Sequence, residues 1–114
     1  MRAAKTTRAS VLSGKAAFDR VFVARLKRNS RYFRFHFAAS ELDHARLGMA
    51  VSRRVDKRSV VRNRLRRQIR QSFRLAMATL PNLDIVVNAK PEAAQAPRGE
   101  VWRDLLDAWP RLRA

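Results

Sequence analysis

The chain has 114 residues, no cysteine and a formal net charge of +17, with 26 lysines and arginines against 9 acidic residues. One domain is expected, because domains of roughly 100–150 residues are the commonest and a second core would not fit. The lack of cysteine excludes a disulfide framework and a thiolate zinc site. No apolar run approaches the ~20 residues that span a bilayer. We therefore expect one cytoplasmic domain over residues 1–114, beginning with a flexible basic arm over residues 1–12.

The positive charge points to a polyanionic partner. Arginine supplies 21 of the 26 basic residues, and its planar guanidinium group suits bidentate phosphate contacts and stacking on bases. The uncompensated charges repel one another in the free protein, and a polyanion would relieve that repulsion. Nucleic acid is therefore favoured over a membrane surface, and the free protein is expected to be a monomer.

Apolar side chains recur at helical spacing early in the chain: Ala17, Phe18, Val21, Phe22 and Leu26. They predict a helix from about residue 14 to 24, with Ser13 as its N-cap.

Two strands are predicted next. Phenylalanines at 33, 35 and 37 alternate with Tyr32, Arg34 and His36, which predicts a strand with one aromatic face and one polar face. After a loop over residues 40–45, a second strand is predicted over 46–52. The short connection favours an antiparallel pair of these two strands.

The second half of the chain predicts helix, strand and helix. A polar connection over residues 53–58 leads to a long helix from about Ser59, its expected N-cap, to about residue 79. Residues 83–89 have the continuous apolar centre of a strand covered on both faces, and residues 90–99 are expected to form a surface linker. Apolar residues at helical spacing, ended by Pro110, predict a final helix: Trp102, Leu105, Leu106 and Trp109. This order predicts an α+β fold, a two-layer α/β sandwich.

The long helix carries an unusual charge pattern. Residues 53–74 hold ten lysines and arginines and one aspartate. At 100° per residue, an apolar arc that contains Leu65, Ile69 and Phe73 lies beside an arginine-rich arc. Arginines follow one another at i, i+4 with no acid between them: Arg62, Arg66, Arg70 and Arg74. A solvated surface normally intersperses both signs, so this pattern favours a helix that is docked on a core and binds phosphates.

The segment Arg62–Arg74 (RNRLRRQIRQSFR) closely resembles the RNR signature of the bacterial ribonuclease P protein subunit. The resemblance extends upstream through Arg46–Arg54 (RLGMAVSRR) and downstream through Leu80, Pro81 and Asp84–Lys90 (DIVVNAK). Phe18 and Phe22 also fit the family pattern, so the resemblance covers roughly residues 13–110. The sequence departs from the family pattern at two positions. Arg25 stands where glycine is frequent, and Asn88 stands where an apolar residue is frequent.

The resemblance implies a small protein that assists a catalytic RNA in removing the 5′ leader of precursor tRNA. The partners would be that RNA and precursor tRNA. The protein alone would be non-catalytic, with no catalytic residue, metal or cofactor of its own, and Mg²⁺ would be required by the RNA-containing holoenzyme. The implied fold is of the αβββαβα type, one strand more than the pattern predicts. Its arginine-rich helix lies in a left-handed βαβ crossover, a handedness implied by the family alone, since such crossovers are right-handed in about 98% of cases.

The resemblance also implies two RNA-binding surfaces. The surface for the catalytic RNA would consist of the RNR segment and its flank: Arg53, Arg54, Lys57, Arg58, Arg62, Asn63, Arg64, Arg66, Arg67, Arg70 and Arg74. A cleft for the single-stranded leader would be lined by Phe18, Phe22, Tyr32, Arg34, His36 and Ser52. Aromatic and arginine side chains along one strand face can stack bases and pair phosphates. The alternative is a ribosomal or other structural RNA-binding protein, which would co-purify with ribosomal subunits.

Overall fold

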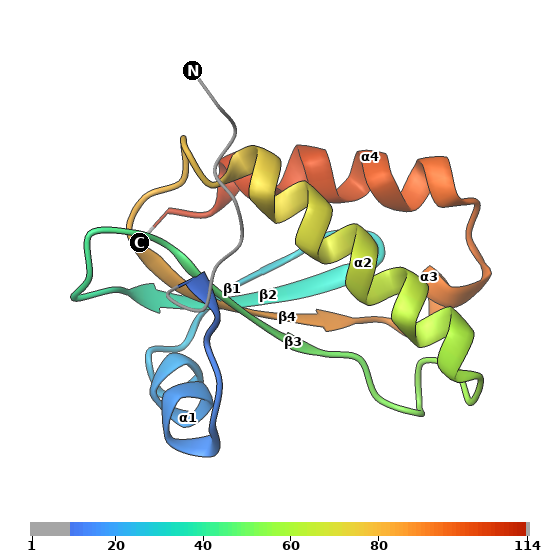
Figure 1. The fold of residues 1–114 in the computed structure, drawn as a ribbon, viewed down its shortest axis with the longest axis horizontal. Helices are drawn as coiled ribbons and strands as arrows, with labels where there is room; N and C mark the ends of the chain where they lie inside the picture. Colours follow the sequence, from blue (N-terminus) through green and yellow to red (C-terminus); the bar gives the residue numbers. More distant parts are fainter. Residues whose placement is uncertain (1–9, 114) are drawn as a thin grey trace.

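The computed structural model describes residues 10–113 as a four-stranded sheet with three helices on one face and one on the other (Figure 1). The elements in chain order are α1 (Lys15–Val23), β1 (Leu26–Asn29), β2 (Phe33–Ala39), β3 (Arg46–Ala50), α2 (Ser59–Ala76), β4 (Leu83–Ala89), α3 (Pro91–Gln95) and α4 (Arg98–Ala108), followed by a 3₁₀ turn (Trp109–Arg111). This confirms the α+β class. None of the described helices is long and apolar enough to cross a membrane.

The strand order in the sheet is β1-β2-β4-β3, so β4 lies between β2 and β3. It pairs antiparallel with β2 and parallel with β3. The predicted antiparallel pair of β2 and β3 is therefore wrong. The first five residues of β4, Leu83–Val87, are all buried, and a strand covered on both faces takes a central place in the sheet. The crossover from β3 through α2 to β4 joins adjacent parallel strands, and its left-handedness stays a prediction.

Strand β1 is the element that the hydrophobic pattern misses. All four of its residues are exposed, so it has no alternation of apolar and polar positions to detect. Leu26, which continues the helical spacing of apolar residues just beyond the predicted end of the first helix, lies in β1 and pairs with Phe37 of β2. The helix ends because Arg25 has φ 58°. That is the left-handed conformation in which glycine is favoured.

Local boundaries differ from the sequence predictions in five places. The N-caps are Gly14 and Arg58, without a side-chain hydrogen bond, so capping by Ser13 and Ser59 is wrong. Helix α2 ends at Ala76, three residues early. The expected linker contains α3, because its Ala93 and Ala94 are buried. Of the expected arm, residues 1–9 lie outside the described residues. Its last part packs on β3, since Leu12 N donates to Leu47 O at 2.8 Å.

The main core lies between the sheet and the helices α2, α3 and α4. Phe33, Phe35 and Phe37 of β2 point into it, as the alternation predicts. Trp109 closes it from the C-terminal side, where its indole N–H donates to the hydroxyl of Ser72 on α2 at 3.0 Å. Because two further helices pack beside it, α2 is held with one side fixed inward and the other facing solvent.

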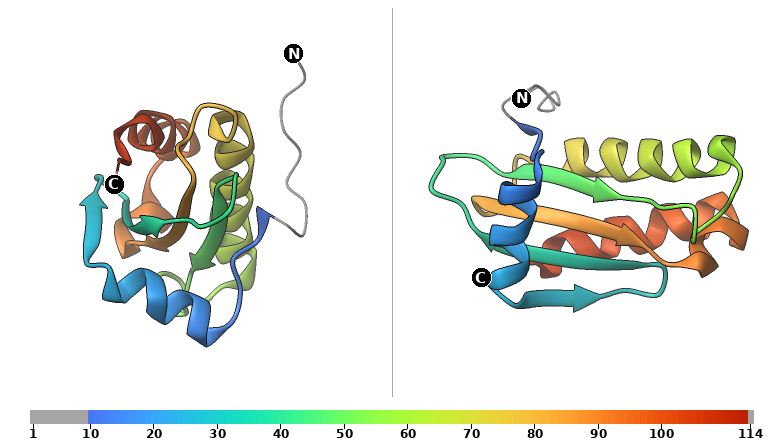
Figure 2. Two further views of the ribbon diagram at one scale, coloured as in Figure 1. Left: turned by 90° about the vertical axis from the view of Figure 1, so that its left-hand side faces the viewer. Right: turned by 90° about the horizontal axis from the view of Figure 1, so that it is seen from below.

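Helix α1 lies alone on the opposite face of the sheet, where it crosses the strands near one end (Figure 2). A small second core seats it there: Leu12, Val21, Ala38 and Val86. The approach is close, because a Cβ at Gly48 would lie 2.7 Å from the ring of Phe18. This helix forms a partial third layer, which the two-layer prediction does not include.

Candidate nucleic-acid interface

Helix α2 is buried along one side, and this confirms the predicted apolar arc. Its buried side chains are Val61, Leu65, Ile69, Ser72 and Phe73. These positions follow one another at intervals of three and four residues, which places them on one face of a helix. The side away from the sheet is therefore left to the polar residues of the same helix.

Three arginines on that outer side are exposed: Arg67, Arg70 and Arg74. We call them the arginine face. Within residues 10–113, none of the three takes part in an ion pair, because the ion pairs lie elsewhere: Lys15–Asp19, Arg20–Asp84, Asp43–His44, Arg46–Asp84 and Asp56–Arg58. Like charges three and four residues apart destabilise a helix. The repulsion along the arginine face is therefore left for an external polyanion to relieve.

The arginines on the flanks of α2 also hold neighbouring segments. Arg66 donates to Val51 O and to Asn63 Oδ1, both at 3.0 Å. Arg64 donates to Ala94 O at 3.2 Å and so ties α2 to α3. The side chains of Arg62, Arg64 and Arg66 are half-buried. Of the predicted RNA-binding set, the flank arginines therefore have structural contacts in addition to their charge.

The loop between β3 and α2 adds further positive charge beside the start of the helix. Arg53, Arg54 and Lys57 are exposed. Arg58 instead pairs with Asp56 at 3.0 Å. Hydrogen bonds from Arg58 lower the pKa of Asp56 to about 2, so this carboxylate is charged at neutral pH. It cancels much of the charge that Arg58 was predicted to offer RNA.

The second predicted surface is the sheet face on which α1 lies. Phe18 lies over Gly48, and the ring of Phe22 meets the His36 ring edge-on, with centroids 4.8 Å apart. Beyond α1 the strands continue without a covering helix (Figure 2). We call this uncovered part the open shelf. Strand register places four side chains on it: Asn29, Arg34, Ala50 and Asn88.

The open shelf is polar and has the guanidinium group of Arg34 at its centre. Arg34 Nε donates to Asn29 Oδ1 at 3.0 Å, and Arg34 is exposed. Ser52 is exposed in the basic loop over residues 51–58, just beyond the end of β3. Asn29 and Asn88 were not among the predicted site residues. Asn88 could have been found from the sequence, because it is a polar residue that interrupts an otherwise apolar strand.

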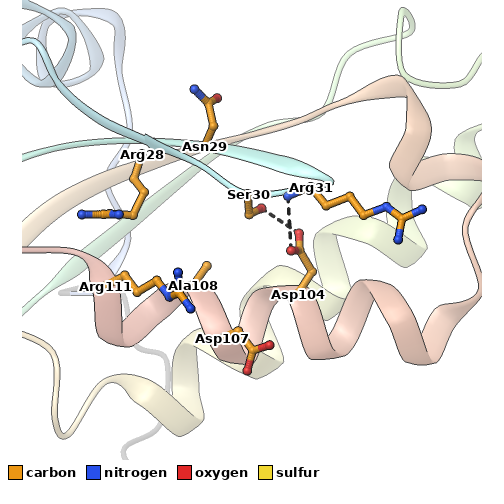
Figure 3. Close-up of a pocket in the computed structure, with 8 residues that line it drawn as sticks. All are labelled: Arg28, Asn29, Ser30, Arg31, Asp104, Asp107, Ala108 and Arg111. Carbon is orange, nitrogen blue, oxygen red and sulfur yellow. Dashed lines mark hydrogen bonds between the residues drawn. The ribbon is translucent and has the colours of Figure 1, made fainter.

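Tyr32 does not join this surface, so its predicted place beside Arg34 and His36 is wrong. It is buried in the main core, and its hydroxyl donates to Glu100 of α4 at 2.8 Å. The reason is that β2 begins only at Phe33. Before it the chain turns toward Asp104 of α4, which accepts hydrogen bonds from Ser30 Oγ and from the N–H group of Arg31 (Figure 3). Asp104 also accepts a hydrogen bond from the N–H group of Tyr32 at 3.0 Å. The alternation of the strand does not extend into this turn.

His36 lies where it was predicted, beneath α1 and half-buried. Burial lowers its pKa below the usual value, and the charges of Arg34 and Lys27 lower it further. The imidazole is therefore mostly neutral at pH 7, and it lies beneath α1 as an uncharged aromatic ring.

A buried carboxylate fixes α1 on the sheet. Asp84 of β4 is fully buried and accepts two hydrogen bonds from Arg46 of β3, from Nε at 2.8 Å and from Nη2 at 2.7 Å. It also pairs with Arg20 of α1. One aspartate thus joins α1 to β3 and β4.

The described part of the chain has no cluster of side chains suited to binding a metal ion. Among residues 10–113, no three histidine, aspartate or glutamate side chains come together in a way that could hold a metal ion. The carboxylates that lie nearest to arginines are already hydrogen-bonded to them. The chemistry that these two surfaces can perform is binding of a polyanion and stacking of bases.

The chain is similar to known proteins over nearly its whole length. The family model of ribonuclease P matches residues 6–113. The ribonuclease P protein component of Coxiella burnetii is 37% identical over 87 residues, 76% of this chain and 72% of that protein. That of Chromobacterium violaceum is 37% identical over 100 residues, 88% of this chain and 83% of that protein.

Solved structures show the same fold. The RNase P protein of Staphylococcus aureus superposes with a TM-score of 0.83 at 26% identity, covering 91% of this chain and 94% of that one. The RNase P protein of Thermotoga maritima gives a TM-score of 0.75 at 27% identity, covering 85% and 92%. The chain therefore belongs to the ribonuclease P protein family, the protein component of the endoribonuclease that matures the 5′ end of tRNA.

Proposed function

We propose that this subunit of ribonuclease P binds the catalytic RNA with the arginine face and the basic loop over residues 51–58. The 5′ leader of precursor tRNA lies along the open shelf. The observation that carries the proposal is the arginine face itself, three exposed guanidinium groups on a docked helix without an acid partner among the described residues. Family membership removes the ribosomal alternative, because the match spans nearly the whole chain.

Each surface has a distinct part in this proposal. The arginine face neutralises phosphates of the RNA, and counterion release contributes to the affinity. Arg34 offers its charge to a leader phosphate, and the neighbouring Phe22 offers a ring edge and face to a base. Contacts of this kind accept any base sequence, which suits leaders that differ from one tRNA to another.

The protein takes no part in bond breaking in this proposal. Phosphodiester hydrolysis usually relies on divalent metals that stabilise the attacking and leaving oxygens. Phosphates of the catalytic RNA would hold the Mg²⁺ ions. This chain lowers repulsion between the RNA strands and holds the substrate in place. We also propose that the free protein is a cytoplasmic monomer, since a net charge of +17 opposes self-association.

Reconstitution tests the function directly. The catalytic RNA from the same organism, mixed with this protein at low Mg²⁺, should cleave precursor tRNA at the 5′ end much faster than the RNA alone. The reason is that protein charge replaces part of the metal charge that the RNA strands need in order to approach each other. The measurement is the single-turnover cleavage rate across a Mg²⁺ titration.

The protein alone is the control, at every Mg²⁺ concentration and with both precursor tRNA and an mRNA as substrate. The mRNA is included because a Staphylococcus aureus RNase P protein mutant is described as defective in mRNA degradation activity. Cleavage by the protein alone would contradict a purely assisting role. An unchanged rate with the protein present would contradict the proposed function.

Replacing Phe22 with alanine tests the shelf. Phe22 is 38% exposed, so the change should cost little stability but remove the ring beside the leader. The holoenzyme should lose affinity for precursor tRNA by about 5- to 100-fold, the range for one stacked base. Its affinity for mature tRNA, which has no leader, should stay the same. The measurement is the Kd of each RNA for the holoenzyme.

Val23→Ala is the matched control, since Val23 follows Phe22 on α1 and is 76% exposed. It should leave both affinities unchanged. Equal losses for precursor and mature tRNA in the Phe22 variant would show that the shelf does not contact the leader.

A further inference from the structure

A shallow pocket on the surface joins helices α2 and α4 beside the arginine face. It is lined by Gln71, Arg74 and Leu75 of α2 and by Trp102 of α4. Leu75 is 58% exposed. Trp102 is only partly buried, whereas Trp109, the other tryptophan, is fully buried in the core. The helical pattern predicts both tryptophans to be core residues, so the exposed edge of Trp102 is not explained by folding.

The charges around this pocket favour a polyanion. Arg74 belongs both to the pocket and to the arginine face, so the two surfaces are continuous. The acidic residues of α4 point elsewhere. At 100° per residue, Glu100, Asp104 and Asp107 lie about 140–160° around the helix from Trp102. Glu100 and Asp104 are hydrogen-bonded to Tyr32 on that far side.

We propose that this pocket binds an unpaired nucleobase of the catalytic RNA. The base stacks on the indole of Trp102 and against Leu75, the amide of Gln71 donates to or accepts from its edge, and Arg74 holds the adjoining phosphate. Aromatic rings and arginines together are what proteins use to bind unstacked bases. A second copy of this chain is disfavoured as the occupant, because each copy carries a charge of +17. The inference rests on the proposed contact of α2 with the RNA and assigns a new residue of α4 to it.

Salt dependence distinguishes stacking from phosphate binding. Trp102→Leu keeps an apolar side chain in the pocket but removes the ring. It should weaken binding of the catalytic RNA by about 5- to 100-fold. The slope of log K against log salt should stay the same, because stacking releases no counterions. Arg74→Ala should lower that slope by about one. Trp102→Phe should restore most of the affinity.

Leu106→Ala is the matched control. Leu106 lies one turn after Trp102 on α4, is 39% exposed and does not line the pocket. The Leu106→Ala variant should bind the catalytic RNA with the same affinity as the unchanged protein. Thermal unfolding of each variant, followed by circular dichroism, shows whether it is folded at the binding temperature.

Fluorescence of the unchanged protein tests the inference without any substitution. Acrylamide should quench Trp102 in the free protein and not Trp109, whose exposed fraction is 1%. With saturating catalytic RNA, the quenching by acrylamide should fall to the level of the buried tryptophan. Unchanged quenching in the saturated complex would overturn the proposal.

Three further outcomes are informative. If the RNA binds with a steep salt dependence and stimulates cleavage while Trp102 stays accessible, the base pocket is wrong and the proposed function stands. If the protein neither binds the RNA nor stimulates cleavage, the proposed function fails as well. A dimer of the free protein that Trp102→Leu dissociates would make the occupant a second copy and overturn the proposal.

Discussion

Replacing Arg67, Arg70 and Arg74 together with alanine should weaken binding of the catalytic RNA by about 100- to 1000-fold at about 0.15 M salt. Each exposed guanidinium group is expected to neutralise one phosphate. The slope of log K against log salt should therefore fall by nearly three. The measurement is the Kd from filter binding or fluorescence anisotropy at five or more salt concentrations. A slope equal to that of the unchanged protein would mean that the arginine face does not meet RNA.

Stability should not fall in this variant. The three side chains are exposed, alanine is the best helix former, and the change removes repulsion between like charges one turn apart. The melting temperature should stay the same or rise, so a loss of binding cannot be attributed to unfolding.

The matched control removes the same amount of charge elsewhere. Arg28, Arg31 and Arg111 are exposed and surround the pocket between the β1–β2 turn and α4 (Figure 3). Their triple alanine variant has the same net charge as the arginine-face variant. It should lose only the part of the affinity that depends on the overall field of the protein. If both variants lose the same affinity and slope, net charge rather than position explains the binding.

Asp84→Asn should lower the free energy of unfolding by about 3 kcal/mol, the lower end of the range for breaking a buried ion pair. The lower end applies because Arg20 and Arg46 keep 50% and 23% of their side-chain surface exposed to water. For a chain of this length, that loss lowers the melting temperature by roughly 10–15 °C. Urea unfolding and differential scanning calorimetry measure the two quantities.

The same substitution should also affect substrate binding below its melting temperature. Without the carboxylate, Arg20 no longer holds α1 to β4, and Phe22 loses its fixed place beside the open shelf. The preference for precursor over mature tRNA should fall, while the affinity for the catalytic RNA alone should stay the same. A variant that keeps its full preference would show that α1 is positioned by its apolar contacts alone.

Asp19→Asn is the control for this prediction. Asp19 pairs with Lys15 in an ion pair whose two side chains are 54% and 90% exposed. Exposed pairs of this kind contribute ~0–1 kcal/mol. The variant should unfold at nearly the same temperature as the unchanged protein and keep its preference for precursor tRNA. A large loss here would mean that any loss of negative charge destabilises this highly basic chain.

The strongly periodic segments were predictable because their own side chains decide their structure. The apolar residues of α2 recur at helical spacing, and those of β2 alternate, so each segment can bury only one face. The charge pattern of α2 also predicted its exposed side. Strand β1 was not predictable in this way, since all of its residues are exposed and only pairing with β2 makes it a strand.

The candidate site was predicted in part. Phe18 and Phe22 of α1 lie against the sheet face that carries Arg34 and His36. Their part in binding the leader stays a prediction. Tyr32 was assigned to the wrong side because strand alternation says nothing about where the strand begins. The start of the strand is decided by Asp104 and Glu100 of α4, which lie more than 60 residues away in the sequence. Both accept hydrogen bonds from Tyr32.

By itself, the sequence determined which segments are helices with a core side, that one of them presents arginines outward, and that a polyanion is the partner. Only the tertiary structure decided the neighbours: that β4 separates β2 from β3, that Asp84 joins α1 to the sheet, and that Trp102 lies beside Arg74. The physical reason is the distance along the chain over which each kind of interaction acts. Periodicity and charge spacing act within one segment, whereas strand order, buried ion pairs and pockets depend on residues that meet only after the chain has folded.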